Sequence, residues 1–257
     1  MALSDKRIQS INIAPVKSLG LVHPQTVHID SRGILEDRRF HLIDGDGRLL
    51  TQRQLGRLVQ VRVDYQMEPE RLALRFPDGS RIEGMPELGG SVMTSIFGRL
   101  VAGRMLTSCW SEALSRFCGR PVTLVQSDEP GQCYDEYPVS IISQASIEEL
   151  GRQPAVTKAI DHRRFRPNFL VGGCLPHEED SWVGGSLQIG DSLMLRIVAR
   201  DPRCAITTHD PDTGERDMDT LRLILSYRPD PQAAYFGMYG IVERPGVVSL
   251  GDTVTPL

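Results

Sequence analysis

The chain has 257 residues and a formal net charge of −4, with 40% hydrophobic and 24% charged residues. These values are ordinary for a globular protein of one large or two small domains, and the missing basic excess argues against a dedicated nucleic-acid-binding protein. Neither a signal peptide nor a membrane span is predicted, and five cysteines without paired spacing favour free thiols in the reducing cytoplasm.

Short runs of alternating apolar and polar residues predict β-strands through the first hundred residues. The runs are centred on residues 8–13, 27–29, 40–43, 59–63 and 72–74. Asp44-Gly-Asp-Gly47 and Pro77-Asp-Gly79 have turn composition and predict hairpins. Residues 84–103 are spaced by glycine and predict no single element. Many short strands with turns at this spacing favour a barrel or a sandwich.

Three helices are predicted further along the chain. The first covers residues 108–118, because Trp110, Leu114, Phe117 and Cys118 share one helical face. The second follows Ser143 as a possible N-cap, contains the capping-box pattern Ser146-Ile-Glu-Glu149, and ends at Gly151. The third is marked by the apolar residues at positions 221, 224 and 225.

The second half of the chain contains a weak internal repeat. Residues 187–193 resemble residues 248–254, each a strand, a Gly-Asp corner and a new strand. Corners at Gly190 and Gly251 suit a small barrel with sharp bends. We therefore predict a mainly β fold with some α structure (α+β) in two tightly packed domains, residues 1–115 and residues 116–257.

The segment that draws most attention is Arg200 to Glu215. A strand-like run at residues 193–198 leads into Asp201-Pro202, which stops the ladder because proline has no N–H to donate. Cys204 follows Arg203, and a guanidinium favours the thiolate, which is the form that attacks or binds metal. Cys204 is the predicted functional residue, as nucleophile or metal ligand. The alternative is that it is a small hydrophobic residue at a strand end. As a nucleophile it needs a base such as His209, whereas as a ligand for a soft metal it needs none.

The remaining cysteines carry weaker signals. Cys118 lies on an apolar helical face and is predicted to be core, while Cys109 and Cys133 have no supporting neighbours. Cys174-Leu-Pro-His177 has a spacing that could hold a metal, but no second pair completes a zinc site and no CxxC occurs. The GxGxxG, Walker, GxSxG and HExxH patterns are also absent from the sequence.

Several cations lie at predicted strand ends in both halves of the chain. They include Lys17, Arg38 and Arg53, together with three arginines in residues 163–168. Each alone could be a solvated charge. Together they could converge on an anionic ligand, because the guanidinium fork binds two phosphate oxygens at once. The helix after Ser143 could add backbone N–H groups for the same anion.

The sequence resembles a family, the MOSC-domain proteins with an N-terminal MOSC β-barrel, in particular the mitochondrial amidoxime-reducing component and its bacterial relatives. The similarity is strongest at Arg203-Cys-Ala-Ile-Thr-Thr-His-Asp-Pro-Asp-Thr-Gly214. Weaker fragments follow in the family's order along nearly the whole chain: residues 11–18, Asp37-Arg38, residues 51–54, Tyr137-Pro138, residues 142–146, residues 164–168, residues 179–182, Phe236-Gly237 and residues 245–252.

The resemblance implies a molybdenum cofactor, a pyranopterin whose dithiolene binds the metal, with Cys204 as protein ligand and catalytic residue. It assigns Lys17, Ser18, Arg38, Thr51, Arg53, Ser143, Arg166, Asn168 and Arg203 to cofactor binding. Thr207, Thr208 and Asp210 would shape the loop around the metal, and Arg39 remains an alternative to Arg38. The two domains would be the N-terminal MOSC β-barrel and the MOSC domain, a second β-barrel with flanking helices.

The implied activity is the reduction of small N-hydroxylated compounds at molybdenum. The chain has no clustered cysteines for an iron–sulfur centre, so the electrons would come from a separate protein of the iron–sulfur, flavin or cytochrome type. Two alternatives stay open: a sulfur carrier with a persulfide on Cys204 for metal–sulfur cofactor assembly, and a carrier that binds the cofactor without turnover.

Overall fold

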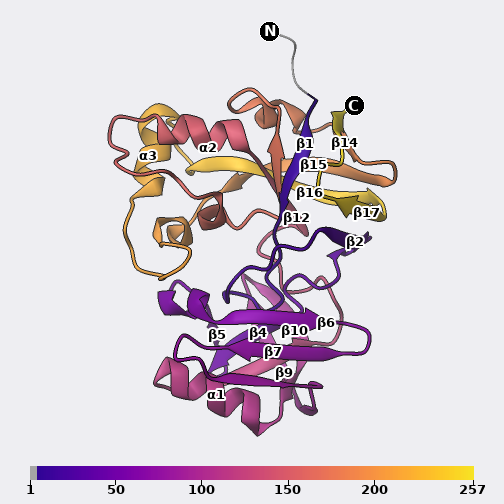
Figure 1. The fold of residues 1–257 in the computed structure, drawn as a ribbon, viewed down its shortest axis with the longest axis vertical. Helices are drawn as coiled ribbons and strands as arrows, with labels where there is room; N and C mark the ends of the chain where they lie inside the picture. The colour runs from indigo at the N-terminus through magenta and orange to yellow at the C-terminus, as the bar shows by residue number, and fades with distance from the viewer. Residues whose placement is uncertain (1–4) are drawn as a thin grey trace.

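The computed structural model describes residues 5–257 and shows two lobes stacked along the long axis of the molecule (Figure 1). Strands dominate both lobes, and three α-helices lie on their outer sides. The predicted α+β class is confirmed.

The lobe that lies lower in Figure 1 contains a five-stranded sheet in the order β5-β4-β11-β10-β9 and a three-stranded sheet in the order β6-β7-β8. The end strands β5 and β9 contact each other, so the larger sheet curls into a nearly closed barrel around an apolar core. Its strands are β4 (Phe40–Asp44), β5 (Leu49–Leu50), β6 (Arg62–Gln66), β7 (Arg71–Arg75), β8 (Arg81–Gly84), β9 (Leu88–Ile96), β10 (Arg99–Leu106) and β11 (Val122–Ser127).

The upper lobe contains a seven-stranded sheet in the order β1-β13-β12-β16-β15-β14-β18 and a small sheet in the order β17-β2-β3. A bridge between Arg7 and Thr253 joins the two end strands of the larger sheet, which closes it around a second core. Its strands are β1 (Arg7–Ile11), β2 (Thr26–Asp30), β3 (Gly33–Ile34), β12 (Val139–Ser143), β13 (Phe169–Gly172), β14 (Ser186–Ile189), β15 (Leu193–Pro202), β16 (Tyr235–Arg244), β17 (Gly246–Ser249) and β18 (Val254–Pro256).

All three predicted helices form. They are α1 (Ser108–Cys118), α2 (Gln144–Gly151) and α3 (Thr220–Tyr227), and four short 3-10 helices accompany them: η1 (Gly56–Gln60), η2 (His162–Phe165), η3 (Glu178–Trp182) and η4 (Ala205–Thr208). The Ser143 hydroxyl caps α2 by accepting the Ser146 N–H, at 3.1 Å. The capping box predicted to begin at Ser146 is therefore wrong, because Ser146 already lies in the first turn of the helix.

Two strand predictions need correction. The apolar run at residues 59–63 is split, because its first half forms η1 and only its second half enters β6. Residues 84–103, for which the glycine spacing predicts no element, form most of the long β9–β10 hairpin. Glycines at positions 89 and 90 lie where the neighbouring strand approaches closely, so there they mark a packing constraint rather than a break.

The two predicted Gly-Asp corners pack against each other. The Gly190 N–H donates to the Thr253 carbonyl at 2.9 Å, and a Cβ at Gly190 would lie 2.7 Å from a carboxylate oxygen of Asp252. Both corner glycines have positive φ, of 58° and 87°. The repeated sequence thus builds two bends of one barrel where β14 and β18 pair.

The two lobes exchange segments of the chain. Strands β1 to β3 belong to the upper lobe, whereas β11 pairs with β4 and β10 in the lower one. The division into residues 1–115 and 116–257 stays a prediction, and the sheets themselves do not separate there. Loops at residues 12–25, 35–39 and 128–138 run along or across the junction, and they carry Lys17, Arg38 and Asp135.

Among residues 5–257, no helix is both long and apolar enough to cross a membrane.

Candidate functional site

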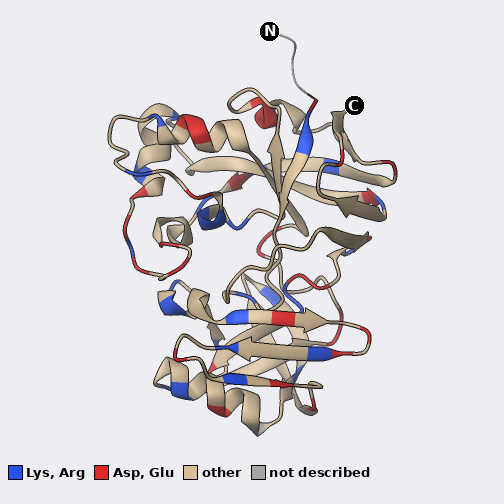
Figure 2. Ribbon diagram, viewed as in Figure 1, with Lys and Arg blue, Asp and Glu red and all other residues tan. Residues whose placement is uncertain are grey.

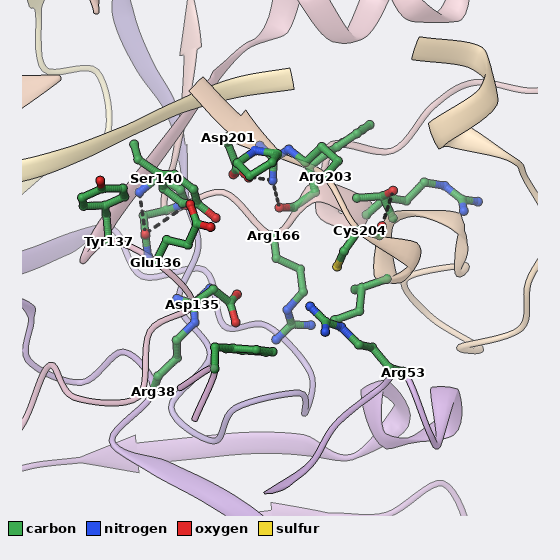
Figure 3. A pocket seen from close by; sticks show the side chains of 18 residues that line it. Arg38, Arg53, Asp135, Glu136, Tyr137, Ser140, Arg166, Asp201, Arg203 and Cys204 are labelled. Atoms are coloured by element: carbon green, nitrogen blue, oxygen red, sulfur yellow. Dashed lines mark hydrogen bonds and ion pairs between the residues drawn. The ribbon is translucent and has the colours of Figure 1, made fainter. Parts of the chain in front are cut away.

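A cleft of about 190 Å³ lies at the junction of the lobes, and 18 side chains line it (Figure 3). Lys and Arg segments occur on both sides of this junction (Figure 2). Seven of the predicted site residues line the cleft: Arg38, Arg53, Arg166, Asn168, Arg203, Cys204 and Thr207. The structure therefore brings together residues from four separate parts of the sequence.

Cys204 lies just past the end of β15. Pro202 is the last residue of that strand, as its missing N–H predicts, although the strand extends beyond Val198. The Cys204 carbonyl accepts hydrogen bonds from the Thr207 N–H and hydroxyl, at 3.1 and 3.0 Å, and these bonds begin the single turn of η4. The thiol is free and half-buried, and Figure 3 shows its sulfur directed into the cleft.

Arg203 lines the cleft and is held by several partners on its wall. Its guanidinium forms an ion pair with Asp201, at 2.7 Å, and donates to the backbone carbonyls of Phe165 and Phe236. One of its terminal nitrogens, Nη2, is buried without a hydrogen-bond partner in the described chain, and a Cβ at position 237 would lie 2.8 Å from it. Gly237, at φ 83°, leaves room for this side chain. Arg203 thus anchors the end of β15.

Asp201 is a buried acid on the cleft wall, only 2% exposed. Loss of hydration raises the pKa of its carboxyl to about 6, although the charge of Arg203 and a hydrogen bond with Tyr239 oppose this shift. Burial also raises the pKa of the Tyr239 hydroxyl. Asp201 therefore takes up a proton at a higher pH than an ordinary aspartic acid does.

Two more cleft arginines are neutralised by carboxylates. Arg38 pairs with Asp37, which also accepts the Ala14 N–H at 2.7 Å and an Asn168 amide N–H at 2.9 Å. Burial lowers the pKa of Arg38, but the nearby carboxylates outweigh it and raise the pKa overall. Arg164 makes a two-pronged pair with Asp217, both distances being 2.7 Å.

The other two cleft arginines, Arg53 and Arg166, have no carboxylate partner within residues 5–257. Arg166 donates to the Leu19 carbonyl at 2.8 Å, and burial together with the charge of Arg38 lowers its pKa to about 10. In Figure 3 the two side chains approach each other in the middle of the cleft beside the Cys204 sulfur. Such a pair of guanidiniums without carboxylate partners in the described chain, beside a thiol, fits an anionic ligand.

The other predicted residues support the site without lining it. Lys17 is buried and donates to Asp135, at 2.7 Å, and to the Cys133 carbonyl, at 2.8 Å. Burial lowers the pKa of this lysine, although Asp135 opposes the shift. Asp135 itself lines the cleft, so Lys17 acts on it through this carboxylate. Ser18 is buried in the same loop with φ of 74°.

Four predicted residues stabilise local turns instead. Thr51 bonds Gln54 and accepts the Arg53 N–H at 3.2 Å, so it shapes the turn that carries Arg53. The Ser143 hydroxyl is already engaged as the N-cap of α2. Thr208 donates to the Ala205 carbonyl, and the Asp210 side chain accepts backbone N–H groups of the following turn.

The structure also places the residues of the open alternatives. Arg38 lines the cleft, whereas Arg39 donates to Ser127. His209 does not line the Cys204 cleft in the described chain, and its Nε2 lies 3.3 Å from the Arg216 side chain. Within residues 5–257 no three His, Cys, Asp or Glu side chains cluster as a metal site, and His177 bonds Tyr227 and Arg228 instead.

Several residues that line the cleft are not predicted from the sequence. Tyr239 and Asp201 lie in strands, where alternation predicts only burial, and Phe97 lies in a segment without predicted structure. Asp135 and Glu136 precede Tyr137-Pro138, so their position before a noted motif is the one signal that could have found them.

Comparison with known proteins gives two family matches. The model of the MOSC domain matches residues 128–255, and that of the MOSC N-terminal beta barrel domain matches residues 5–100. The mitochondrial amidoxime reducing component 2 of Rattus norvegicus is 30% identical, with 96% of this chain and 82% of that protein covered. Its Homo sapiens counterpart is 32% identical, with 94% and 81% covered. The crystal structure of the YuaD protein from Bacillus subtilis gives a TM-score of 0.45 at 16% identity, covering 97% of this chain and 93% of that one.

Proposed function

Since the chain belongs to the family of MOSC-domain proteins with an N-terminal MOSC β-barrel, we propose that it binds a molybdenum cofactor in the Cys204 cleft and reduces N-hydroxylated compounds there. The relatives named amidoxime-reducing components support the type of reaction. The observation that carries the proposal is one half-buried thiol beside two arginines that have no carboxylate partner within residues 5–257.

The donor set of the cleft fits this cofactor. Cys204 is the only cysteine that lines it, and the described chain offers no further cluster of metal ligands. A metal held here must therefore bring most of its own ligands, as a dithiolene-bearing pterin does. A soft thiolate is a suitable remaining ligand for molybdenum. The buried Arg203 Nη2, which lacks a partner in this part of the chain, marks the same wall as polar.

The residues divide into five roles in this proposal. Cys204 would ligate the metal, while Arg53 and Arg166 would bind the anionic groups of the cofactor with their free N–H donors. Asn168 and Thr207 line the cleft and would contact the pterin. Lys17, Ser18, Thr51, Ser143, Thr208 and Asp210 would act by shaping the loops around it, and Arg38 and Arg203 by fixing the walls.

When bound, the cofactor would supply the two-electron chemistry that cleaves an N–O bond. The protein would orient the substrate and limit access of water, because the cleft lies at the junction of two packed lobes. Reduction of an N-hydroxyl group to N–H with release of water also consumes two protons. Asp201 can hold a proton on the cleft wall, since its pKa is raised to about 6 by burial.

Electrons would come from a separate redox protein of the iron–sulfur, flavin or cytochrome type. The five cysteines are all free and belong to no group of three or more metal-ligating side chains in the described chain, so they offer no cluster site there. Free thiols also agree with our proposal of a cytoplasmic location.

The test is molybdenum and pterin content after production in cofactor-competent cells. We expect near-stoichiometric amounts of both in the wild type, no molybdenum in Cys204→Ala, and a normal content in the control Cys174→Ala, which removes another half-buried thiol. Turnover of hydroxylamines and amidoximes with an artificial reductant should follow the metal. A wild-type protein without metal and pterin, but with a labile extra sulfur on Cys204, would support the sulfur carrier instead. Full cofactor without turnover under any reductant would support the non-catalytic carrier.

A further inference from the structure

The turn between β9 and β10 brings an aromatic side chain to the cleft. Ile96 and Arg99 are paired, so the turn consists of only two residues, Phe97 and Gly98. Both have positive φ, of 47° and 86°, as a two-residue hairpin turn of type I′ demands. Glycine adopts this conformation freely, but a phenylalanine does so at a cost in free energy. Such an outlier motivates the question of what the side chain does.

The turn is fixed in place over the cleft. Arg99 donates to the Asp135 carbonyl at 2.7 Å and to the Tyr134 carbonyl, and its guanidinium lies 4.5 Å from the centre of the Tyr134 ring. Asp135 is itself a cleft residue, so the hairpin of the lower lobe is attached to the loop that returns the chain to the upper lobe.

The Phe97 ring lies against two cations of the site. Its centre is 4.8 Å from the Arg53 guanidinium carbon and 5.2 Å from the Lys17 ammonium nitrogen. Phe97 is 42% exposed, so it contributes little to a core. Lys17 also has a carboxylate partner, Asp135, whereas the Arg53 guanidinium makes no hydrogen bond or ion pair within residues 5–257. Phe97 is therefore the main contact that orients Arg53.

We propose that Phe97 is a positioning residue that holds the Arg53 guanidinium in the cleft for an anionic group of the ligand. This inference rests on the proposed function, in which Arg53 binds such a group. A carboxylate would orient the arginine equally well, but it would neutralise the charge and compete with the anion. An aromatic face attracts the cation through its quadrupole and leaves the N–H donors free.

The same chain offers a matched pair outside the cleft. The Arg57 guanidinium lies 5.3 Å from the centre of the Phe117 ring, a comparable geometry on the lower lobe. Neither residue lines the cleft. Phe117→Leu therefore removes an aromatic–arginine contact of the same kind without touching the site, and it controls for any general loss of stability.

The experiment is calorimetric titration of the cofactor-free full chain with inorganic phosphate at low salt. We expect Phe97→Leu to weaken phosphate binding roughly three- to tenfold, the size of one cation–π contact, and Phe97→Tyr to restore it. Arg53→Met should weaken binding at least as much. In the Arg53→Met background, Phe97→Leu should cause no further loss, because the two residues act through one contact. Retention of pterin by protein from cofactor-competent cells should follow the same order.

Three outcomes overturn the inference while leaving the proposed function in place. In the first, Phe97→Leu binds phosphate like the wild type although Arg53→Met does not. In the second, the loss of affinity caused by Phe97→Leu adds in full to that caused by Arg53→Met, and in the third, Phe117→Leu weakens phosphate binding as much as Phe97→Leu does. If Arg53→Met itself binds phosphate like the wild type, the role given to Arg53 in the proposed function is wrong, and the positioning role of Phe97 fails with it.

Discussion

Arg203 on the upper side of the cleft and Arg53 on the lower side both line it, but the surroundings of the two charges are opposite (Figure 3). Arg203 is buried among Asp201 and two backbone carbonyls. Arg53 is exposed and rests on an aromatic ring, without an ion-pair partner among residues 5–257. The same residue type therefore serves as framework on one side and as binding group on the other.

This difference separates stability from binding. A buried, paired charge is costly to remove because its partner is left unpaired and without water. An exposed, unpaired charge contributes little to folding and is free for a ligand. The predictions below test this separation at single residues.

The largest effect on stability is expected for Arg203→Met. It leaves the Asp201 carboxylate buried without its cation, which should lower the free energy of unfolding by about 3–5 kcal/mol at pH 8. The control is Arg196→Met, which removes an exposed partner of Glu243 and should cost less than about 1 kcal/mol. Urea unfolding measures both. Equal losses in the two variants would show that the upper wall is not held by the Arg203 pair.

The second prediction concerns pH and Asp201. A folded-state pKa raised to about 6 means that this group supports the fold fully below the unfolded value near 3.8, and that the support is lost as pH rises through about 6. Between pH 4 and pH 8 the wild type should lose about 2–3 kcal/mol relative to Asp201→Asn. The charged and titratable groups that act on this carboxyl are Arg203, Tyr239, Asp135 and Glu136.

Urea unfolding at a series of pH values checks this prediction, with Asp46→Asn as a control at an exposed carboxyl. Parallel curves for the wild type and Asp201→Asn would mean that burial does not raise the pKa of Asp201. In that case Asp201 could not serve as the proton-holding group that we assign to this wall.

Arg166→Met should change the free energy of unfolding in the opposite direction, toward greater stability. Burial lowers the pKa of Arg166, which means that the folded chain without cofactor disfavours this charge. Its replacement by an apolar side chain of similar length should raise the free energy of unfolding of the cofactor-free chain by about 1–2 kcal/mol. The same variant should retain less pterin. A destabilised Arg166→Met protein would place this arginine in the framework together with Arg203.

The smallest effect on stability is expected for Arg53→Met. The exposed guanidinium loses only its contact with Phe97, so the free energy of unfolding should change by less than about 0.5 kcal/mol. Cofactor retention should nevertheless fall clearly. Urea unfolding and pterin fluorescence on the same preparation test both halves, and a large loss of stability would remove the distinction between the two sides of the cleft.

Much of the fold can be read from local patterns. The helix of residues 108–118, the cap at Ser143 and the turns at residues 44–47 and 77–79 are predicted from periodicity and turn chemistry, and the structure confirms them. These features depend on neighbours within a few residues, so the sequence contains their causes. Proline at position 202 likewise ends β15 and places Cys204 just beyond a strand.

The sequence by itself also determined the family, the candidate thiol and the set of cations at strand ends. Only the tertiary structure decided which cations are free. Lys17 pairs with Asp135, which is 118 residues away in the sequence, and Arg164 pairs with Asp217, which is 53 residues away. Arg53 and Arg166 have no carboxylate partner in the described chain. Charge partners, the exchange of strands between lobes and the position of Phe97 all arise from contacts between distant segments. Local sequence cannot specify them, because they depend on how the two barrels close and pack.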